Sequence, residues 1–487
     1  MSKRIEIVCN ALKAKLINPD DEARIIVTEL LSYFVDGYDK TYSFKAGHWD
    51  GRASMFSWSN NTFPVGFKSL VNARLFKAGY QVVNVAKPLP EPLGRVPETL
   101  GGFSYSDRYD YQWKGIKELE KRGIMISRFA TGAGKTFHAA LATARINRPT
   151  LILTKRQPLL YQFWERLGDF GFKPGIVGDN RFLIKPELTV AMAQTLSKRL
   201  EADDEVGKAV RKYLNSVEFI IGEEVHEISD NTYFNVINNC PNAHYRLGLT
   251  ATPFMGTDSE MNMRLLGAFG PIGIDVSEKM LIDRGINAKP IFKVARYDSS
   301  PKLKFNSGYH KAIFEGITHC DVRNACIVEH VKKAAERKLP SLVLIQRQDH
   351  GKVLRAQMLD AGIKTDYIYG EDDSKERRTA LKNLGTGKID ALIGSRIVDV
   401  GVDVPSIGLV VMAGGGKAEV AYRQRIGRGL REKKGVANVC FVLDFYDAHN
   451  RHLHEHYLER IRFVKSTPGF AENLLKEGQD FPWELFE

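Results

Sequence analysis

The chain has 487 residues and a formal net charge of +12 at pH 7, with 43% hydrophobic and 26% charged residues. This length predicts about three domains, and the composition is that of a globular protein rather than a disordered chain. The basic balance favours a polyanionic partner, most simply nucleic acid. The five cysteines include no Cys-x-x-Cys pair, which argues against a disulfide framework or a zinc site and fits a reducing cytosol. No apolar run approaches the roughly 18–20 residues of a membrane span.

Residues 1–86 are expected to form a small α+β module. Helical periodicity predicts helices over Asp21–Tyr33 and Pro64–Ala78. Strand-like runs cover Ala53–Trp58 and Tyr80–Val85. Residues 87–104 are rich in proline and glycine, so we expect a linker there.

Aromatic and basic residues alternate between the first helix and the first strand of this module. Lys45, Trp49 and Arg52 belong to this stretch and are our candidates for contact with nucleic-acid backbone and bases. The alternative is that the aromatic residues are core and that Asp50-Gly51 is simply a hairpin turn.

Residues 105–287 alternate short apolar runs with helical stretches, which is typical of a parallel α/β sheet. The runs are Gly123–Ile126, Thr150–Thr154, Leu188–Ala191, Glu218–Ile221 and Tyr245–Leu249. Polar residues follow each run, and nucleotides bind at the carboxyl edge of such sheets.

The first of these runs leads into a phosphate-binding loop with the sequence Thr131-Gly132-Ala133-Gly134-Lys135-Thr136. Its glycines let the backbone aim N–H groups at phosphate oxygens. Lys135 can reach the β- and γ-phosphates, and the Thr136 hydroxyl can bind Mg²⁺. The Ala-rich stretch Phe137–Ile146 places the loop at a helix N-terminus. The alternative is a chance Gly-rich turn, and Phe129 stands where the general pattern has a glycine.

Two carboxylates, Glu223 and Glu224, follow the apolar run Glu218–Ile221. We assign Glu223 to Mg²⁺ and Glu224 to polarising the attacking water. The alternative is a strand followed by an acidic helix start. Farther along, Thr250 and Thr252 lie just past a strand, where they are expected to touch His226 and Glu224 and to couple the ATP site to the nucleic-acid site.

A second α/β array is expected over residues 288–450. Its predicted strands are Ser341–Gln346, Thr365–Tyr369, Ala391–Gly394, Leu409–Met412 and Val439–Leu443. Tyr422–Arg431 reads as a helix with Arg425, Arg428 and Arg431 on one face. These guanidiniums are suited to a γ-phosphate, and the alternative is a solvated basic face. In the predicted helical tail, residues 451–487, we expect His452, His454, His456 and Arg460 to face water rather than DNA.

Residues 109–431 contain, in order, a series of motifs that resembles that of the superfamily 2 helicases. The matching stretches are Tyr111-Gln112, Ala130–Thr136, Thr154–Gln162, Gln194-Thr195, Glu223–His226, Leu249–Pro253, Leu344–Arg347, Ser395–Pro405 and Gln424–Arg431. Glu223 stands where these helicases usually have Asp. The resemblance implies two tandem RecA-like domains, with ATP between them and nucleic acid across their top.

The same resemblance implies roles for individual residues. Gln112 would read the adenine and Asp403 would touch the ribose. The nucleotide site would comprise Gln112, Thr131, Gly132, Ala133, Gly134, Lys135, Thr136, Gly401, Asp403, Arg428 and Arg431. Catalysis would rest on Lys135, Glu224, Gln424, Arg428 and Arg431, with Mg²⁺ on Thr136 and Glu223. Nucleic acid would meet Lys155, Arg156, Gln162, Gln194, Thr195, Arg347 and Ser395.

The N-terminal stretches Lys45–Arg52 and Pro64–Phe67 resemble the small domain that precedes the motor in phage UvsW-type recombination helicases. This implies an ATP-dependent DNA helicase or translocase that remodels forks, Holliday junctions and R-loops in recombination, replication or repair. We expect a monomer in the cytoplasm of a phage-infected bacterium, with phage or host recombination proteins as partners. The alternatives are an RNA helicase, a restriction-type DNA translocase subunit, or a nucleic-acid-binding protein that does not hydrolyse ATP.

Overall fold

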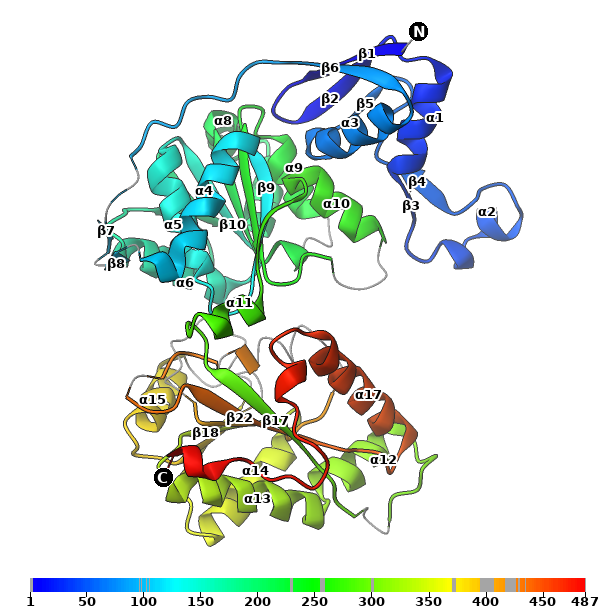
Figure 1. The fold of residues 1–487 in the computed structure, drawn as a ribbon. Helices are drawn as coiled ribbons and strands as arrows, with labels where there is room; N and C mark the ends of the chain where they lie inside the picture. The colour runs from blue at the N-terminus through cyan, green and yellow to red at the C-terminus, as the bar shows by residue number, and fades with distance from the viewer. Residues whose placement is uncertain are drawn as a thin grey trace. The chain divides into compact units, whose positions relative to one another are not determined.

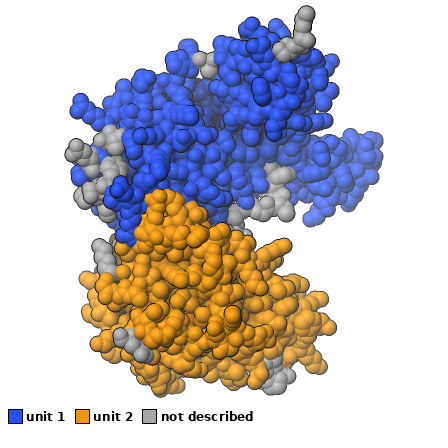
Figure 2. Space-filling model, in the orientation of Figure 1, with its two compact units in different colours: residues 1–129, 134–276 blue, residues 130–133, 277–487 orange. Residues whose placement is uncertain are grey.

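The computed structural model describes residues 3–486 except 96, 98, 102, 105, 228–230, 255–258, 299–301, 370–373, 395–406, 417–425, 428, 429 and 434. The chain forms two compact units (Figure 2). Unit 1 comprises residues 1–129 and 134–276, and unit 2 comprises residues 130–133 and 277–487. None of the described helices is both long and apolar enough to cross a bilayer.

The N-terminal module of unit 1 is a four-stranded sheet in the order β5-β2-β1-β6, with two helices against it (Figure 1). Its strands are β1 Lys3–Cys9, β2 Lys13–Ile17, β5 Thr62–Pro64 and β6 Tyr80–Ala86, and its helices are α1 Asp21–Leu30 and α3 Lys68–Lys77. Strand β1 alternates along its length, so that Ile5 and Ile7 are buried while Arg4 is exposed. They share the module core with Val27, Phe63 and Leu75.

A small two-stranded arm interrupts this module between α1 and β5. It consists of β3 Ser32–Phe34, α2 Tyr42–Lys45 and β4 Arg52–Ser54. The helix predicted to reach Tyr33 ends at Leu30, because Ser32–Phe34 pairs with Arg52–Ser54 instead. The strand predicted over Ala53–Trp58 is correspondingly shorter.

The rest of unit 1 is built on an eight-stranded sheet in the order β12-β11-β13-β10-β14-β15-β9-β16. Its strands are β9 Ile124–Phe129, β10 Thr150–Thr154, β11 Gly175–Gly178, β12 Arg181–Leu183, β13 Leu188–Met192, β14 Phe219–Glu223, β15 Tyr245–Thr250 and β16 Ile272–Val276. All adjacent pairs are parallel except β11 and β12. The helices are α4 Asp110–Arg122, α5 Lys135–Ile146, α6 Gln157–Asp169, α7 Ala193–Leu200, α8 Glu205–Ser216, α9 Asn231–Asn238 and α10 Ser259–Phe269. Each of the five predicted strands is present, whereas β11, β12 and β16 were not predicted.

Apolar side chains cover both faces of this sheet. In β10, Leu151 and Leu153 pack into one core cluster while Ile152 packs into the cluster on the opposite face. Burial on both sides explains why the strands read as continuous apolar runs rather than alternating ones.

The N-terminal module is packed against this sheet within the same unit. The buried guanidinium of Arg246 on β15 donates from Nη2 to the carbonyl oxygen of Ala11, at 2.7 Å. Gly66 lies so close to α10 that a Cβ there would come within 2.2 Å of the Leu266 carbonyl oxygen. Leu266 itself packs on the module core.

Unit 2 contains a six-stranded parallel sheet in the order β17-β22-β21-β18-β20-β19. Its strands are β17 Lys289–Ala295, β18 Ser341–Leu344, β19 Thr365–Ile368, β20 Ala391–Gly394, β21 Leu409–Val411 and β22 Val439–Phe445. Its described helices are α11 Glu278–Asp283, α12 Tyr309–Ile313, α13 Asp321–Glu336, α14 Gln348–Asp360, α15 Ser374–Gly385 and α17 Arg451–Ser466. The predicted fold class, two parallel-sheet domains after a small α+β module, is confirmed.

The C-terminal residues contribute to the core of unit 2. The ring of Phe481 stacks on Phe441 of β22 at a centroid distance of 4.6 Å, and Phe470 lies 5.3 Å from Phe292 of β17. The domain boundaries predicted from the sequence remain predictions, because the contacts define only the two units.

Candidate functional site

The phosphate-binding loop connects β9 to α5. The backbone is in the left-handed region at Gly132 (φ +90°) and Gly134 (φ +84°), a conformation that glycine adopts without steric cost. Helix α5 begins at Lys135 with no acidic residue in its first turn. The positive end of the helix dipole is therefore open to an anion at the loop.

Lys135 and Glu224 form an ion pair at the carboxyl edge of the sheet. Nζ of Lys135 donates to Oε1 of Glu224 at 2.9 Å, and the two side chains are 16% and 14% exposed. Burial alone would raise the pKa of Glu224, but the Lys135 ammonium, together with the nearby His226 ring, outweighs burial, so the pKa is lowered. Glu224 also has φ +45°, which is strained for a non-glycine residue. Such strain is concentrated at functional sites.

Thr136 and Glu223 are the predicted Mg²⁺ ligands. Thr136 lies in the first turn of α5, and Glu223 ends β14 with only 5% of its surface exposed. A hydroxyl and a carboxylate are the oxygen ligands that Mg²⁺ prefers, so the donor chemistry fits this ion. Coordination by this pair remains a prediction.

The predicted coupling residues lie together next to Glu224. Nδ1 of His226 is hydrogen bonded to the Thr250 hydroxyl at 2.8 Å, and both residues are buried. The Thr252 N–H donates to the same hydroxyl oxygen at 3.1 Å. His226 Nδ1 also approaches Oε2 of Glu224 to 3.2 Å, but this contact lacks hydrogen-bond geometry, so the bond to Thr250 is the better defined of the two. A continuous set of contacts thus runs from Lys135 to Thr252.

Buried side chains of α4, β9 and α5 pack around the phosphate-binding loop. Gln112 on α4 is buried, and its Nε2 donates to the Gly134 carbonyl oxygen at 3.4 Å. His138 lies 4.6 Å from the Phe129 ring, and its Nε2 is 3.2 Å from the Ser127 hydroxyl. Burial lowers the pKa of His138 to about 3, so it is neutral. The sequence interpretation missed His138 and Ser127, because neither stands in a recognisable motif.

The nucleic-acid candidates of the first sheet follow two neighbouring parallel strands. Lys155 and Arg156 come directly after β10, with Gln162 on α6, and Gln194 and Thr195 lie in the first turn of α7, which begins directly after β13. Lys155, Arg156, Gln194 and Thr195 therefore lie near the carboxyl edge of this sheet, the edge that carries the phosphate-binding loop, and Gln162 lies one turn farther along α6. Their contacts with nucleic acid remain predictions.

The three candidates in the N-terminal module belong to the arm. Lys45 is exposed, and the Arg52 guanidinium lies 4.7 Å from the Phe34 ring centroid. Nε1 of Trp49 donates to the Arg52 carbonyl oxygen at 2.6 Å. Trp49 and Arg52 thus contact each other within the arm, where Arg52 also contacts Phe34. Their contacts with nucleic acid remain predictions, while Tyr42 of the same arm is 81% exposed.

In unit 2, Arg347 is exposed directly before α14, and Arg431 forms an isolated β-bridge with Asn287. The remaining predicted site residues of this half lie outside the described residues and stay predictions. They are Ser395, Gly401, Asp403, Gln424 and Arg428.

Arg460 differs from its prediction, because it neither faces water nor is available to DNA. Its side chain is 2% exposed, and Nη2 donates to Oδ2 of Asp447 at 2.9 Å. Nε donates to Oδ2 of Asp444 at 3.0 Å, and Nη1 to the Gly416 carbonyl oxygen at 3.0 Å. A charged residue is buried here because two carboxylates compensate its charge. No group of three or more His, Cys, Asp or Glu side chains in the described chain could hold a metal ion.

Comparison with known proteins identifies two family models in the order that the motifs predict. Residues 106–255 match the res subunit of type III restriction enzymes, and residues 323–433 match the helicase conserved C-terminal domain. The ATP-dependent DNA helicase uvsW of enterobacteria phage T4 is 23% identical over 450 residues, covering 86% of each chain. The DNA 3'-5' translocase XPB2 of Sulfurisphaera tokodaii is 27% identical over 360 residues, covering 66% of this chain and 78% of the relative.

Among solved structures, a fragment of a putative HsdR subunit of a type I restriction enzyme from Vibrio vulnificus shares the fold. Its TM-score is 0.52 at 17% sequence identity, covering 74% of this chain and 66% of that chain. The two family models and the helicase relatives, matched over most of their length, together show that the chain is an ATP-dependent helicase of superfamily 2, with UvsW among its homologues.

Proposed function

We propose that this helicase is a DNA translocase that uses ATP hydrolysis to remodel branched DNA. The observation that carries the proposal is the chain of contacts from Lys135 through Glu224 and His226 to Thr250. These contacts connect the proposed phosphate-binding lysine and a buried carboxylate to Thr250, the last residue of β15.

ATP is the substrate that this site fits. Lys135 and the loop N–H groups would bind its phosphates, and release of Glu224 from Lys135 would leave that carboxylate to orient the attacking water. Mg²⁺ on Thr136 and Glu223 would neutralise charge on the phosphates. We assign Arg428 and Arg431 to the γ-phosphate, where guanidiniums stabilise charge that develops during transfer.

DNA is the proposed substrate because the match to uvsW, whose name describes a DNA helicase, spans most of both chains. The branched form is proposed from the resemblance of Lys45–Arg52 and Pro64–Phe67 to the UvsW-type recombination helicases. A net charge of +12 supports a polyanionic partner. The arm with Lys45 and the exposed Tyr42 would add a contact outside the motor. By the same likeness, the proposed setting is the cytoplasm of an infected bacterium, where the protein acts as a monomer with recombination proteins as partners.

The test is steady-state ATPase activity without nucleic acid and with single-stranded DNA, duplex DNA, a four-way junction or RNA, all at one salt concentration. We expect the strongest stimulation by the junction. Lys135→Ala controls for contaminating ATPases and should be inactive with every activator. Stimulation by RNA alone would contradict the proposal, as would no turnover with any activator.

A second candidate is a translocating subunit of a restriction-type enzyme, because the family model that matches residues 106–255 carries that description. Such a subunit should be stimulated by linear duplex DNA at least as strongly as by a junction. The same ATPase comparison therefore separates the two functions.

A further inference from the structure

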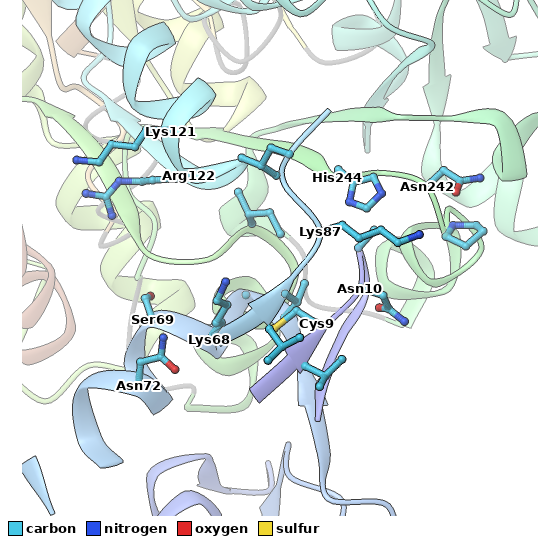
Figure 3. A pocket seen from close by; sticks show the side chains of 18 of the residues that line it. Cys9, Asn10, Lys68, Ser69, Asn72, Lys87, Lys121, Arg122, Asn242 and His244 are labelled. Carbon is cyan, nitrogen blue, oxygen red and sulfur yellow. The ribbon is translucent and has the colours of Figure 1, made fainter. Parts of the chain in front are cut away.

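A basic cavity lies between the N-terminal module and the first motor sheet (Figure 3). Its volume is about 720 Å³, and its described lining residues include Lys68, Lys87, Lys121 and Arg122 but no Asp or Glu. Figure 3 shows Lys121 and Arg122 on one side, His244 and Lys87 on the other, and Lys68 between these two groups. The cationic groups are therefore spread along the cavity rather than gathered at one point.

The cavity is distinct from the ATP site, because it lies at the opposite edge of the same sheet. Ile124 begins β9, and His244 and Pro271 directly precede β15 and β16, so these lining residues mark the amino ends of three strands. The phosphate-binding loop follows the carboxyl end of β9. A six-residue strand separates the two edges by about 20 Å at ~3.3 Å per residue.

The two walls of the cavity are fixed to each other. Lys68 comes from α3 of the module, Lys87 directly follows β6, and Lys121 comes from α4 of the motor domain. The hydrogen bond from Arg246 to Ala11 joins these two parts, and Ala11 itself lines the cavity. The cavity is therefore a built feature of unit 1 rather than a gap between loose parts.

Among the described residues, three lysines of the cavity form no ion pair, although Glu118 still acts on Lys121 from a longer distance. Arg122 is paired with Glu118 at 2.7 Å, and Glu218, which acts on His244 from outside the lining, is paired with Arg148 at 2.6 Å. In the described chain, no carboxylate lies within ion-pair distance of the remaining three cations, Lys68, Lys87 and Lys121. Burial lowers the pKa of His244, so this ring is a neutral hydrogen-bonding group. A site that gathers cations without acids is suited to an anion.

We propose that this cavity binds phosphate groups of a DNA strand and so forms a second nucleic-acid contact, made jointly by the N-terminal module and the first motor domain. No Phe, Tyr or Trp is among its described lining residues, so bases have no large aromatic ring on which to stack. The contact would therefore follow the backbone and would not depend on sequence. This inference rests on the proposed DNA translocase function.

The test uses two double variants. The cavity variant carries Lys68→Gln and Lys87→Gln, and the control variant carries Lys15→Gln and Lys77→Gln, which change the net charge by the same amount. Lys15 and Lys77 are exposed lysines of the same module outside the cavity lining. We expect the cavity variant to bind forked DNA about five- to tenfold more weakly. The slope of log affinity against log salt should fall by about 1.8, since each lost duplex phosphate contact contributes about 0.9. ATPase activity without DNA should be unchanged, and replacement of both lysines by Arg should restore binding.

Three outcomes would overturn the inference. A cavity variant that matches the control in affinity and salt slope would leave the cavity without a role in DNA binding. The second outcome concerns inorganic tripolyphosphate, measured in a Lys135→Ala background so that the ATP site does not bind it. If its binding requires Lys68 and Lys87 while the cavity variant binds DNA as tightly as the control, the cavity would be assigned to small phosphate compounds. The third, loss of the folded state in the cavity variant but not the control, would make the lysines structural. Failure of the proposed function is distinguishable, because the unmodified protein would then show no DNA-stimulated ATPase activity.

Discussion

Replacing Thr250 by valine should uncouple ATP hydrolysis from DNA. Valine keeps the branched shape but removes the hydroxyl, and this change is not neutral in a buried site. Two hydrogen bonds disappear, one with His226 Nδ1 at 2.8 Å and one from the Thr252 N–H at 3.1 Å. Lys135 and Glu224 keep their own 2.9 Å contact.

The structure gives the size of the effect. A buried polar group that loses its partner costs about 1–3 kcal/mol, and a coupling energy of that size corresponds to roughly 5- to 150-fold. We therefore expect DNA stimulation of ATPase activity to fall at least about fivefold. Activity without DNA should stay within about threefold, because the phosphate-binding groups are untouched.

The assay is kcat with and without saturating forked DNA, together with DNA affinity and the thermal midpoint. Thr189→Val is a matched control. Thr189 is also a buried threonine of this sheet, and its hydroxyl accepts a hydrogen bond from the Lys185 N–H and donates one to the Lys185 carbonyl oxygen, both at 2.9 Å. The reasoning is refuted if Thr250→Val loses no more stimulation than Thr189→Val. It is also refuted if basal and stimulated rates fall equally, which would place Thr250 in the hydrolytic centre itself.

Three further predictions concern the two units. Lys135→Ala should abolish ATPase activity but leave DNA affinity, measured by fluorescence anisotropy, within about threefold, and normal turnover would contradict the loop assignment. Arg460→Ala should destabilise unit 2 by about 3–5 kcal/mol, because it removes the guanidinium that the buried carboxylates of Asp444 and Asp447 share and leaves Asp447 with Arg323; a thermal midpoint equal to wild type would be evidence against this. Burial, with smaller effects from Arg323 and His319, lowers the pKa of His350 from 6.5 to about 3. Between these values only the unfolded chain binds the proton, so stability should fall as the pH drops through this window, by at most about 1.4 kcal/mol per pH unit. The measurement is the free energy of unfolding in urea at pH 7, 6 and 5, which should depend less on pH in His350→Gln than in the unmodified protein. An unchanged pH dependence would show that the pKa of His350 is not lowered in the folded state.

The parallel strands were predictable because burial on both faces leaves a continuous apolar run in the sequence. Thr150–Thr154 and Ala391–Gly394 were predicted with the bounds that the structure gives. The helix from Asp21 was predicted too long, because the helical periodicity of the sequence continues past Leu30. In the structure, residues Ser32–Phe34 instead form a strand that pairs with Arg52–Ser54. The alternation of Lys3–Cys9 was a readable strand signal that the sequence interpretation did not use.

Features that depend on tertiary contacts were not predictable. Arg460 reads as one more basic residue on a polar helix, and only the fold brings it to Asp444 and Asp447. The basic cavity draws its cations from segments around Lys68, Lys87 and Lys121, none of which forms a motif. By contrast, Lys135 and Glu224 were both assigned from the sequence to ATP hydrolysis, because each follows a recognisable strand of one sheet, and their ion pair is seen only in the structure.

Strand β15 connects the two sites of unit 1 through a single buried element. Near its amino end, Arg246 holds the module at Ala11, beside the basic cavity. At its carboxyl end, Thr250 contacts His226 in the proposed ATP site. The four-residue interval is about 13 Å of extended chain, hydrogen bonded to β14 on one side and β9 on the other. The hydrogen bond from Arg246 to Ala11 thus attaches the module to the strand whose other end reaches His226, and DNA held in the cavity would be bound by the same unit that contains Lys135 and Glu224.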